Sequence, residues 1–167
     1  MSAVVLVVGL VAAQRLAELA YGRRNATALL QRGGVEIGRG HYPLFAVLHG
    51  TWLAALLLLV PAQTPIAWPW LALFLVLQAL RLWVMASLGR YWTTRVIMMP
   101  HEPVVRRGPY RFLRHPNYIV VAAEIAVLPL VFGAWRIALV FSLLNAALLA
   151  WRIRIEERAL APRREPA

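Results

Sequence analysis

Long apolar segments separated by short polar ones form the main pattern of this chain. Four windows approach or exceed the ~17–20 residues with which a helix crosses a bilayer, and they cover residues 3–21, 42–61, 66–88 and 118–151. The last window is long enough for two short helices. Its segment 133–136, Gly-Ala-Trp-Arg, offers the turn, because glycine permits tight turns and Trp and Arg suit a membrane interface. The pattern predicts an all-α, polytopic membrane protein of about five transmembrane helices that ends in a helical hairpin.

Composition predicts a single membrane domain over residues 1–167. Hydrophobic residues make up 61% of the 167 residues, which is far above the share usual in soluble domains. We expect three transmembrane helices in 1–88, a cytoplasmic loop in 89–117, and the hairpin with a C-terminal cytoplasmic segment in 118–167. The N-terminal window lacks a basic leader and a small-residue cleavage site, so we expect it to be a retained helix.

The basic residues predict the orientation of the chain. All 18 of them are Arg, and the formal net charge is +11. They gather between the first two windows, between the third and fourth, and after the last, whereas 61–67 and 133–136 hold one Arg between them. Five spans put the three Arg-rich segments on one side, which the positive-inside rule makes cytoplasmic. We therefore expect a bacterial inner-membrane protein with its N-terminus outside and its C-terminus in the cytoplasm, and no nucleic acid is needed to explain the charge.

Missing residue types and motifs exclude several functions. The chain has no Cys, which excludes disulfide scaffolds, thiolate metal sites and Cys nucleophiles, and we expect no bound metal. It has neither a Gly-x-Gly-x-x-Gly run after a strand nor a P-loop, and His101-Glu102 lacks the second His of a zinc-protease motif. A soluble nucleotide-binding fold is thereby excluded, so any cofactor must be held by loops against membrane helices.

The proline-rich loop 89–117 is the first candidate for chemistry. Its four prolines keep it from forming one long helix. Pro116 suits the first turn of the fourth helix, with His115 before it, and the free backbone N–H groups at such an end can receive an anionic ligand group. A basic loop at the lipid surface is the alternative interpretation. Because a helical hairpin returns to the side it left, the far end of the fifth helix should lie beside His115.

That far end carries Arg152 and Glu156, which are four residues apart and share a helix face. A surface ion pair is one interpretation of this spacing. However, Arg before Glu is the less favourable order, and a carboxylate near a helix C-terminus opposes the helix dipole. These two observations favour a functional role.

Polar side chains inside the apolar windows should face the bundle and find partners there. For Arg81, a side chain that extends to the inner interface is a further interpretation, and for Glu124 a structural pair and a substrate role are both open. His49 in the second window either packs in the core or lines a cavity. The intramembrane polar residues are Gln78, Arg81, Glu124 and Asn145.

The motif 108–118, Gly-Pro-Tyr-x-x-x-Arg-His-Pro-x-Tyr, followed by a hairpin and by the motif 152–157, Arg-x-x-x-Glu-Glu, resembles the isoprenylcysteine carboxyl methyltransferase family. The resemblance is specific over about 101–160. It is looser in the first hundred residues, which are similar to short bacterial members in Arg15-x-x-Glu18, Arg24-Asn25 and His41-Tyr42-Pro43 with His49. Family members are integral-membrane enzymes that use S-adenosylmethionine.

The resemblance also implies which residues form the site. Arg152 would face the acceptor, and we add His49 as a second acceptor-binding candidate. Arg152 and Glu156 would be the catalytic pair. Either His101 or Glu102 would take the place of an upstream His that many members have. The residues implied in cofactor binding are Glu102, Pro103, Val104, Val105, Tyr110, His115, Pro116, Asn117, Tyr118 and Glu156.

The function implied is S-adenosylmethionine-dependent O-methyl transfer to a carboxylate or acidic hydroxyl of a lipophilic acceptor at the cytoplasmic membrane face. A carboxylate or acidic enol is already ionised near neutral pH, and an Arg can hold that anion by paired hydrogen bonds. Prenylcysteine-like molecules and alkylpyrones or phenolic lipids are alternative acceptors, and membrane lipid is the other partner. Two alternative functions are an NADPH-dependent oxidoreductase of sterol-reductase type and a non-enzymatic transport or assembly subunit. The oligomeric state is open.

Overall fold

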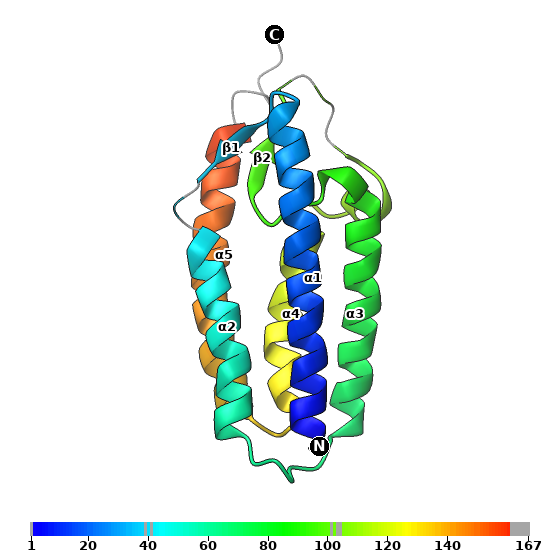
Figure 1. Ribbon diagram of the computed structural model, residues 1–167, viewed down its shortest axis with the longest axis vertical. Helices are drawn as coiled ribbons and strands as arrows, with labels where there is room; N and C mark the ends of the chain where they lie inside the picture. The colour runs from blue at the N-terminus through cyan, green and yellow to red at the C-terminus, as the bar shows by residue number, and fades with distance from the viewer. Residues whose placement is uncertain (1, 39, 41, 101, 103–104, 161–167) are drawn as a thin grey trace.

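The part of the chain that the structure describes forms a bundle of five α-helices with a small sheet at one end (Figure 1). The computed structural model describes residues 2–38, 40, 42–100, 102 and 105–160 of the 167. The helices are α1 (Ala3–Gln31), α2 (Tyr42–Leu59), α3 (Trp68–Leu88), α4 (Pro116–Leu130) and α5 (Trp135–Leu160). The other elements are the strands β1 (Val35–Ile37) and β2 (Val96–Met98) and the 3-10 helices η2 (Gly89–Tyr91) and η3 (Gly108–Arg111).

Three helices of the described chain are long and apolar enough to cross a membrane. They lie within Ala3–Gln31, Trp68–Tyr91 and Trp135–Arg158, while Pro43–Leu59 and Pro116–Leu130 are shorter apolar helices. The prediction of an all-α membrane protein that ends in a helical hairpin is therefore confirmed.

The hairpin turn falls where the sequence predicted it. Helix α4 ends at Leu130 and α5 begins at Trp135. Gly133 between them has a φ of 64°, a backbone conformation that only glycine adopts at little cost. Pro129 lies in the last turn of α4, one residue before the helix ends.

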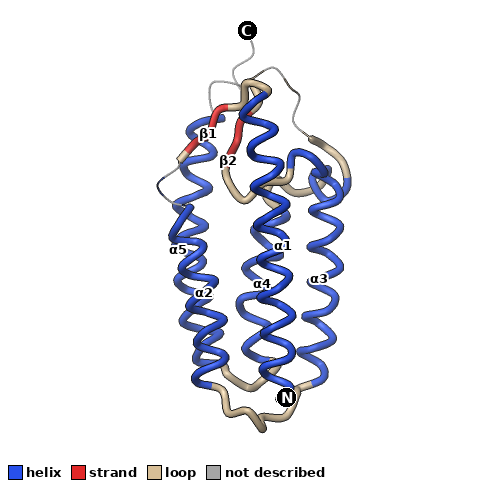
Figure 2. Tube along the Cα trace, in the orientation of Figure 1, coloured by secondary structure: helices blue, strands red, loops and turns tan. Residues whose placement is uncertain are grey.

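The connections between helices divide between the two ends of the bundle (Figures 1 and 2). The segments that join α1 to α2 and α3 to α4 lie at the same end as the last turns of α5. The short turns that join α2 to α3 and α4 to α5 lie at the opposite end, near the N-terminus. The Arg-rich connections are thus brought to one end of the molecule, as the five-helix prediction requires.

Helix α4 is the centre of the bundle. It packs most extensively against α3 and α5, and its buried residues include Val121, Ile125 and Leu128. These join a core to which α1 contributes Val8 and α2 contributes Trp52, both 0% exposed. The apolar cluster fills the half of the bundle that lies nearer the N-terminus. The half that carries the sheet is left for polar groups.

The structure differs from the sequence prediction in two elements. Helix α1 runs ten residues beyond the predicted window, to Gln31, because its last turns pack against the loop after α3: the Asn25 amide donates to the carbonyls of Trp92 (2.8 Å) and Gly89 (3.2 Å). The sheet was not predicted. Its two strands pair antiparallel, with Glu36 opposite Ile97, and they fold β1 over the loop between α3 and α4.

Four charged side chains form a buried network between α1, α3 and α4. Arg81 donates to both oxygens of Glu18 (2.6 Å each) and to Glu124 (2.9 Å). Arg15 donates to Glu18 (2.9 Å) and Glu124 (2.7 Å). The Arg81 side chain is only 7% exposed, so the alternative in which it extends to the interface is wrong. Two Arg and two Glu balance in charge, which offsets the cost of burying each ion.

Candidate active site

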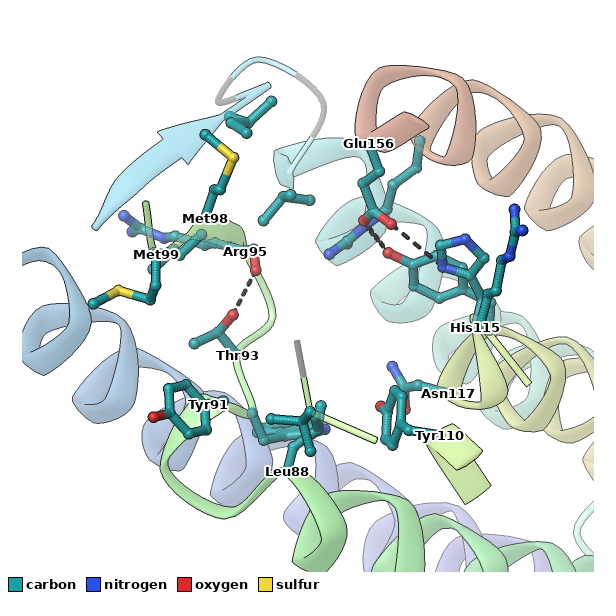
Figure 3. A pocket seen from close by; sticks show the side chains of 18 of the residues that line it. Leu88, Tyr91, Thr93, Arg95, Met98, Met99, Tyr110, His115, Asn117 and Glu156 are labelled. Carbon is teal, nitrogen blue, oxygen red and sulfur yellow. Dashed lines mark hydrogen bonds and ion pairs between the residues drawn. The ribbon is translucent and has the colours of Figure 1, made fainter. Parts of the chain in front are cut away.

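Two cavities adjoin in the half of the bundle that carries the sheet. The first, which we call the loop cavity, has a volume of about 320 Å³ and lies between β2, the α3–α4 loop and the facing ends of α4 and α5 (Figure 3). The second, which we call the membrane cavity, has a volume of about 350 Å³ and lies among α1, α2, α4 and α5. The residues that line both cavities are Trp92, Thr93, Asn117, Tyr118 and Arg152.

The start of α4 forms one wall of the loop cavity. Pro116 occupies the first turn, where its missing N–H costs nothing, and His115 precedes it without a side-chain capping bond. The rings of His115 and Tyr118 stack in parallel, with 5.1 Å between their centroids. Asn117 also lines the wall, and its side-chain oxygen is buried without a hydrogen-bond partner among the described residues. This wall therefore offers an aromatic surface and an unpaired amide oxygen.

The end of α5 completes the site opposite that wall. Glu156 Oε1 accepts a hydrogen bond from the Tyr118 hydroxyl, and Glu156 Oε2 lies 3.5 Å from His115 Nδ1 (Figure 3). Arg152 Nε donates to the Tyr118 hydroxyl (2.8 Å) and lies 3.1 Å from Glu156 Oε1. The hairpin thus brings the two sequence motifs into contact. Within α5, Arg152 and Glu156 also form the i,i+4 ion pair of the alternative interpretation, but with both side chains largely buried and not at the surface.

Arg152 is held on several sides at the border of the two cavities. Its Nη1 donates to the carbonyl of Thr94 (3.1 Å), and its guanidinium carbon lies 5.3 Å from the ring centroids of both Phe45 and Tyr118. The hydrogen bonds of Arg152 to described residues use Nε and Nη1. Its Nη2 is left to donate to a ligand.

Tyr110 forms part of the loop cavity through η3. Burial, and then the nearby Glu156 carboxylate, raise the pKa of the Tyr110 phenol above its ordinary value. The phenol is therefore protonated at any physiological pH and can act as a hydrogen-bond donor.

The upstream strip lies at the rim of the loop cavity. Glu102 and Val105 line the cavity, whereas His101, Pro103 and Val104 lie outside the described residues. The Glu102 carboxylate accepts hydrogen bonds from Arg32 and from the Tyr91 hydroxyl. These contacts join the end of α1 and the α3–α4 loop at the rim.

Most sequence-predicted site residues meet around these cavities. Glu102, Val105, Tyr110, His115, Asn117, Tyr118, Arg152 and Glu156 line the loop cavity. Arg152 and His49 line the membrane cavity. Pro116 is buried at the start of α4 and is not among the lining residues, so its contribution is to begin the helix.

Sequence reasoning missed the wall opposite α4 and α5. Tyr91, Trp92 and Thr93 line the loop cavity, as do the residues of β2 and Met99 (Figure 3). A weak signal was available: the apolar run 96–99 follows two Thr and an Arg, and Val-Glu-Ile at 35–37 alternates in polarity between glycines. Strands of three residues are too short for such a pattern to stand out.

The fold and site define a polytopic helical membrane protein with a polar site at one end of its bundle. The model of the isoprenylcysteine carboxyl methyltransferase family matches residues 70–162, which is more than half of the chain. The chain therefore belongs to this family of membrane methyltransferases. The match covers α3 from residue 70, all of α4 and α5, and the residues that line the loop cavity except Ile37, while α1, β1 and α2 precede it.

Two bacterial relatives cover nearly the whole chain. The uncharacterized protein YpbQ of Bacillus subtilis is 38% identical over 160 residues, which cover 93% of this chain and 95% of that protein. An uncharacterized protein of Haemophilus influenzae is 26% identical over 152 residues, 88% of each chain. No solved structure gives a significant match.

Proposed function

We propose that the protein is an S-adenosylmethionine-dependent O-methyltransferase that acts on a lipophilic acceptor at the cytoplasmic face of the bacterial inner membrane. The observation that carries this proposal is the shared border of the two cavities, with Asn117, Tyr118 and Arg152. The loop cavity lies among loop segments and is lined by His115 and Glu156, which suits a water-soluble cofactor, whereas the membrane cavity lies among helices, which suits a lipid. The residues at the border are positioned to contact both.

The residues of the loop cavity fit S-adenosylmethionine. Glu156 supplies a carboxylate for a cationic ligand, the unpaired Asn117 oxygen can accept from an ammonium or amino group, and Met98 and Met99 offer an apolar surface for a base. When bound, the cofactor supplies a methyl group on a positively charged sulfur. Glu102, Val105, Tyr110, His115 and Tyr118 would form the remaining wall. Pro103 and Val104 stay predictions from the family motif.

Arg152 would hold the acceptor's anionic oxygen. Its Nη2 has no hydrogen bond to any residue that the structure describes, and the contacts with Thr94 and Tyr118 fix the guanidinium at the cavity border. Methyl transfer to an oxygen that is already ionised depends on position and charge more than on acid–base groups. Arg152 therefore needs only to bind the oxygen in place, while the apolar walls exclude water.

The membrane cavity would hold the acceptor's apolar chain. Leu53, Val121 and Leu149 line its interior, and Leu16, which is 68% exposed, lies at its edge on α1. Prenylcysteine-like acids and alkylpyrone or phenolic lipids all combine an acidic oxygen with such a chain. Each of these acceptors is compatible with the cavity.

The single-domain arrangement and its orientation are part of the proposal. The three helices of 1–88, the loop 89–117 and the segment 118–167 would act as one unit, because Glu18 on α1 is bonded to Arg81 on α3 and Arg15 to Glu124 on α4. The Arg-rich end of the bundle would face the cytoplasm.

Cofactor binding tests the proposal against the two alternative functions. S-adenosylhomocysteine should raise the melting temperature of the purified full-length protein, and NADPH should not, because ligands stabilise only the folded state that binds them. His115→Ala should weaken this stabilisation, and Arg23→Ala, on the exposed side of α1, is the matched control. Stabilisation by NADPH alone would favour the oxidoreductase, and stabilisation by neither would favour the non-enzymatic subunit. Labelled methyl transfer to extracted lipids would then identify the acceptor.

A further inference from the structure

The membrane cavity contains a second set of polar side chains that the proposed transfer does not use. Arg15 on α1 and His49 on α2 both line it, and both lie outside the residues that the family model matches. Polar groups inside a membrane bundle are costly unless they have partners, so the unused bonding capacity here indicates a ligand.

The hydrogen bonds of His49 settle which of its ring nitrogens is available. Nδ1 lies 2.8 Å from the carbonyl oxygen of Phe45. A carbonyl oxygen only accepts, so Nδ1 carries the proton and donates. In the neutral ring Nε2 is then an acceptor, and it has no hydrogen bond to any described residue. His49 thus presents an acceptor to a ligand.

Arg15 presents donors in the same cavity. Its Nη1 and Nη2 each donate to one carboxylate, of Glu18 and Glu124, which uses two of the five N–H groups of a guanidinium. Nε has no hydrogen-bond partner among the described residues. Nε is buried, but Arg15 lines the cavity and its side chain is 13% exposed, and Nη1 and Nη2 each keep a second N–H for a ligand.

The charge balance of the network restricts the ligand group to a neutral one. Arg15 and Arg81 already match Glu18 and Glu124. A second carboxylate or an amine on the acceptor would add an unpaired ion beside this balanced set, in surroundings where unpaired ions are expensive. A neutral group that both donates and accepts fits without that cost.

We propose that the acceptor carries, besides its methylated oxygen at Arg152, a second neutral group that accepts from the Arg15 guanidinium and donates to His49 Nε2. This inference rests on the proposed function for the role of Arg152. A hydroxyl and a secondary amide both meet the requirement. A plain fatty acid does not, and neither does a lipid with a second carboxylate. Arg15 and His49 would thereby select among lipids that present the same acidic oxygen.

Two pairs of probe molecules test the secondary amide and the hydroxyl separately. S-farnesyl-3-thiopropanoic acid and N-acetyl-S-farnesylcysteine differ by one acetamido group, and a 3-alkylphenol and the 5-alkylresorcinol of equal chain length differ by one hydroxyl. Equilibrium affinities are measured by calorimetry on the full-length protein in lipid nanodiscs, without cofactor. Each probe is measured on both the wild type and His49→Phe, so its partition into lipid cancels in the comparison.

The wild type should prefer the member with the additional group in at least one pair, and His49→Phe should reduce that preference on the order of tenfold, because one hydrogen bond in a charged environment is lost. His49→Gln, which keeps an acceptor, should restore part of the preference and covers the case in which His49→Phe fails to fold. Thr51→Val is the matched control, because within the described part of the chain the Thr51 hydroxyl bonds to carbonyls of its own helix alone, and it should keep the full preference.

If the preference between the two members of a pair is the same in the wild type and in both His49 variants, the inference is overturned. It is also overturned if none of the four probes binds. Methyl transfer is measured separately. A preference that depends on His49, found without any methyl transfer, would refute the proposed function and leave the second polar site standing. Methyl transfer without that preference would support the proposed function and refute the second polar site.

Discussion

At the scale of single residues, the chemistry converges on Arg152 and Glu156. Both side chains are about nine-tenths buried, with 11% and 9% exposed, and they share the Tyr118 hydroxyl. They nevertheless contact different surroundings. Arg152 reaches toward Phe45 and the membrane cavity, whereas Glu156 reaches His115 and lines only the loop cavity. This asymmetry predicts separable roles for them although they form an ion pair.

Replacing Arg152 should therefore affect the acceptor and not the cofactor. In Arg152→Ala, Glu156 keeps its contacts with Tyr118 and His115, so S-adenosylhomocysteine should still bind. Turnover should fall roughly 10²–10³-fold, the usual cost of removing a group that stabilises a reacting oxygen. Arg152→Lys should restore little, because an ammonium cannot reproduce the planar fork. Calorimetry of cofactor binding and a labelled-methyl assay measure the two effects.

Glu156→Gln is the complementary variant. It should weaken cofactor binding about tenfold or more, the loss expected for one hydrogen bond to a charged group. A purely structural ion pair predicts something else: similar losses of stability in the two variants, with activity intact. Because the pair is buried, each loss would be ~3–5 kcal/mol. Matching phenotypes in the two variants would refute the assignment.

At the scale of elements, the loop cavity depends on how η3 docks on α3. Gly108 begins η3 with a φ of 56°, and a Cβ at this position would lie 2.1 Å from Ser87 Oγ. Beside it, Arg107 Nε donates to the carbonyl of Ser87 (2.6 Å). The contact fixes the position from which Tyr110 lines the cavity.

Gly108→Ala should consequently destabilise the protein by ~1–3 kcal/mol, from both the clash and the left-handed backbone. It should also weaken S-adenosylhomocysteine binding, because η3 moves. Gly9→Ala in α1 is the control, since no atom lies within 4 Å of its Cβ, and alanine should favour that helix slightly. Thermal unfolding of the two variants in one detergent compares them. An unchanged melting temperature for Gly108→Ala would mean that η3 does not dock as described.

The helices and strands also show which parts of the fold could be predicted from the sequence. Apolar windows predicted the five helices and glycine predicted the hairpin turn, because both signals are local. The pairing of β1 with β2 is between segments 59 residues or more apart in sequence, as in Val96 with Ile37, and no local pattern encodes it. Trp92 could not be predicted for the same reason. Its carbonyl accepts a hydrogen bond from Asn25 on α1, and these two residues, distant in sequence, meet only in the folded chain.

The buried charged network of Arg15, Glu18, Arg81 and Glu124 was predicted only in part. The sequence predicted that Gln78, Arg81, Glu124 and Asn145 would find partners inside the bundle, and the first three do. Asn145 is buried, but its side-chain nitrogen and oxygen have no hydrogen-bond partner among the described residues. The sequence could not predict that Glu18 and Arg15 on α1 are the partners in the network, because helix order in space does not follow from hydropathy. The network therefore fastens α1, which precedes the family match, to the helices that form the loop cavity.

The network predicts a sharp difference between single and paired substitutions. Arg81→Leu leaves Glu18 without its main partner, and breaking a buried pair costs ~3–5 kcal/mol. Arg81→Leu with Glu18→Leu removes both ions and leaves Arg15 paired with Glu124, so the double variant should be the more stable of the two. Melting temperatures decide this. A double variant that is less stable than Arg81→Leu would show that the pair contributes net stability.

At the scale of the whole molecule, the position of the site depends on the topology. The segments that supply the loop cavity's lining lie at the same end of the bundle as the Arg-rich connections. The N-terminus lies at the other end (Figure 1). A cofactor made in the cytoplasm reaches the cavity only if the Arg-rich end faces the cytoplasm. The positive-inside rule requires the same orientation independently, so one measurement tests both arguments.

Reporter fusions after Gly38, Thr64, Arg106 and Arg158 should read inside, outside, inside and inside. The critical position is Thr64, between α2 and α3. Helix α2 has 18 residues and α4 has 15, so at ~1.5 Å per residue they span only ~27 and ~22 Å, less than a ~30 Å hydrocarbon core. If α2 spans despite its length, the bilayer thins or the helix ends extend with interfacial side chains, and Thr64 reads outside. A cytoplasmic signal at Thr64 would mean that α2 and α3 do not both cross, and the orientation proposed for the site would fail with it.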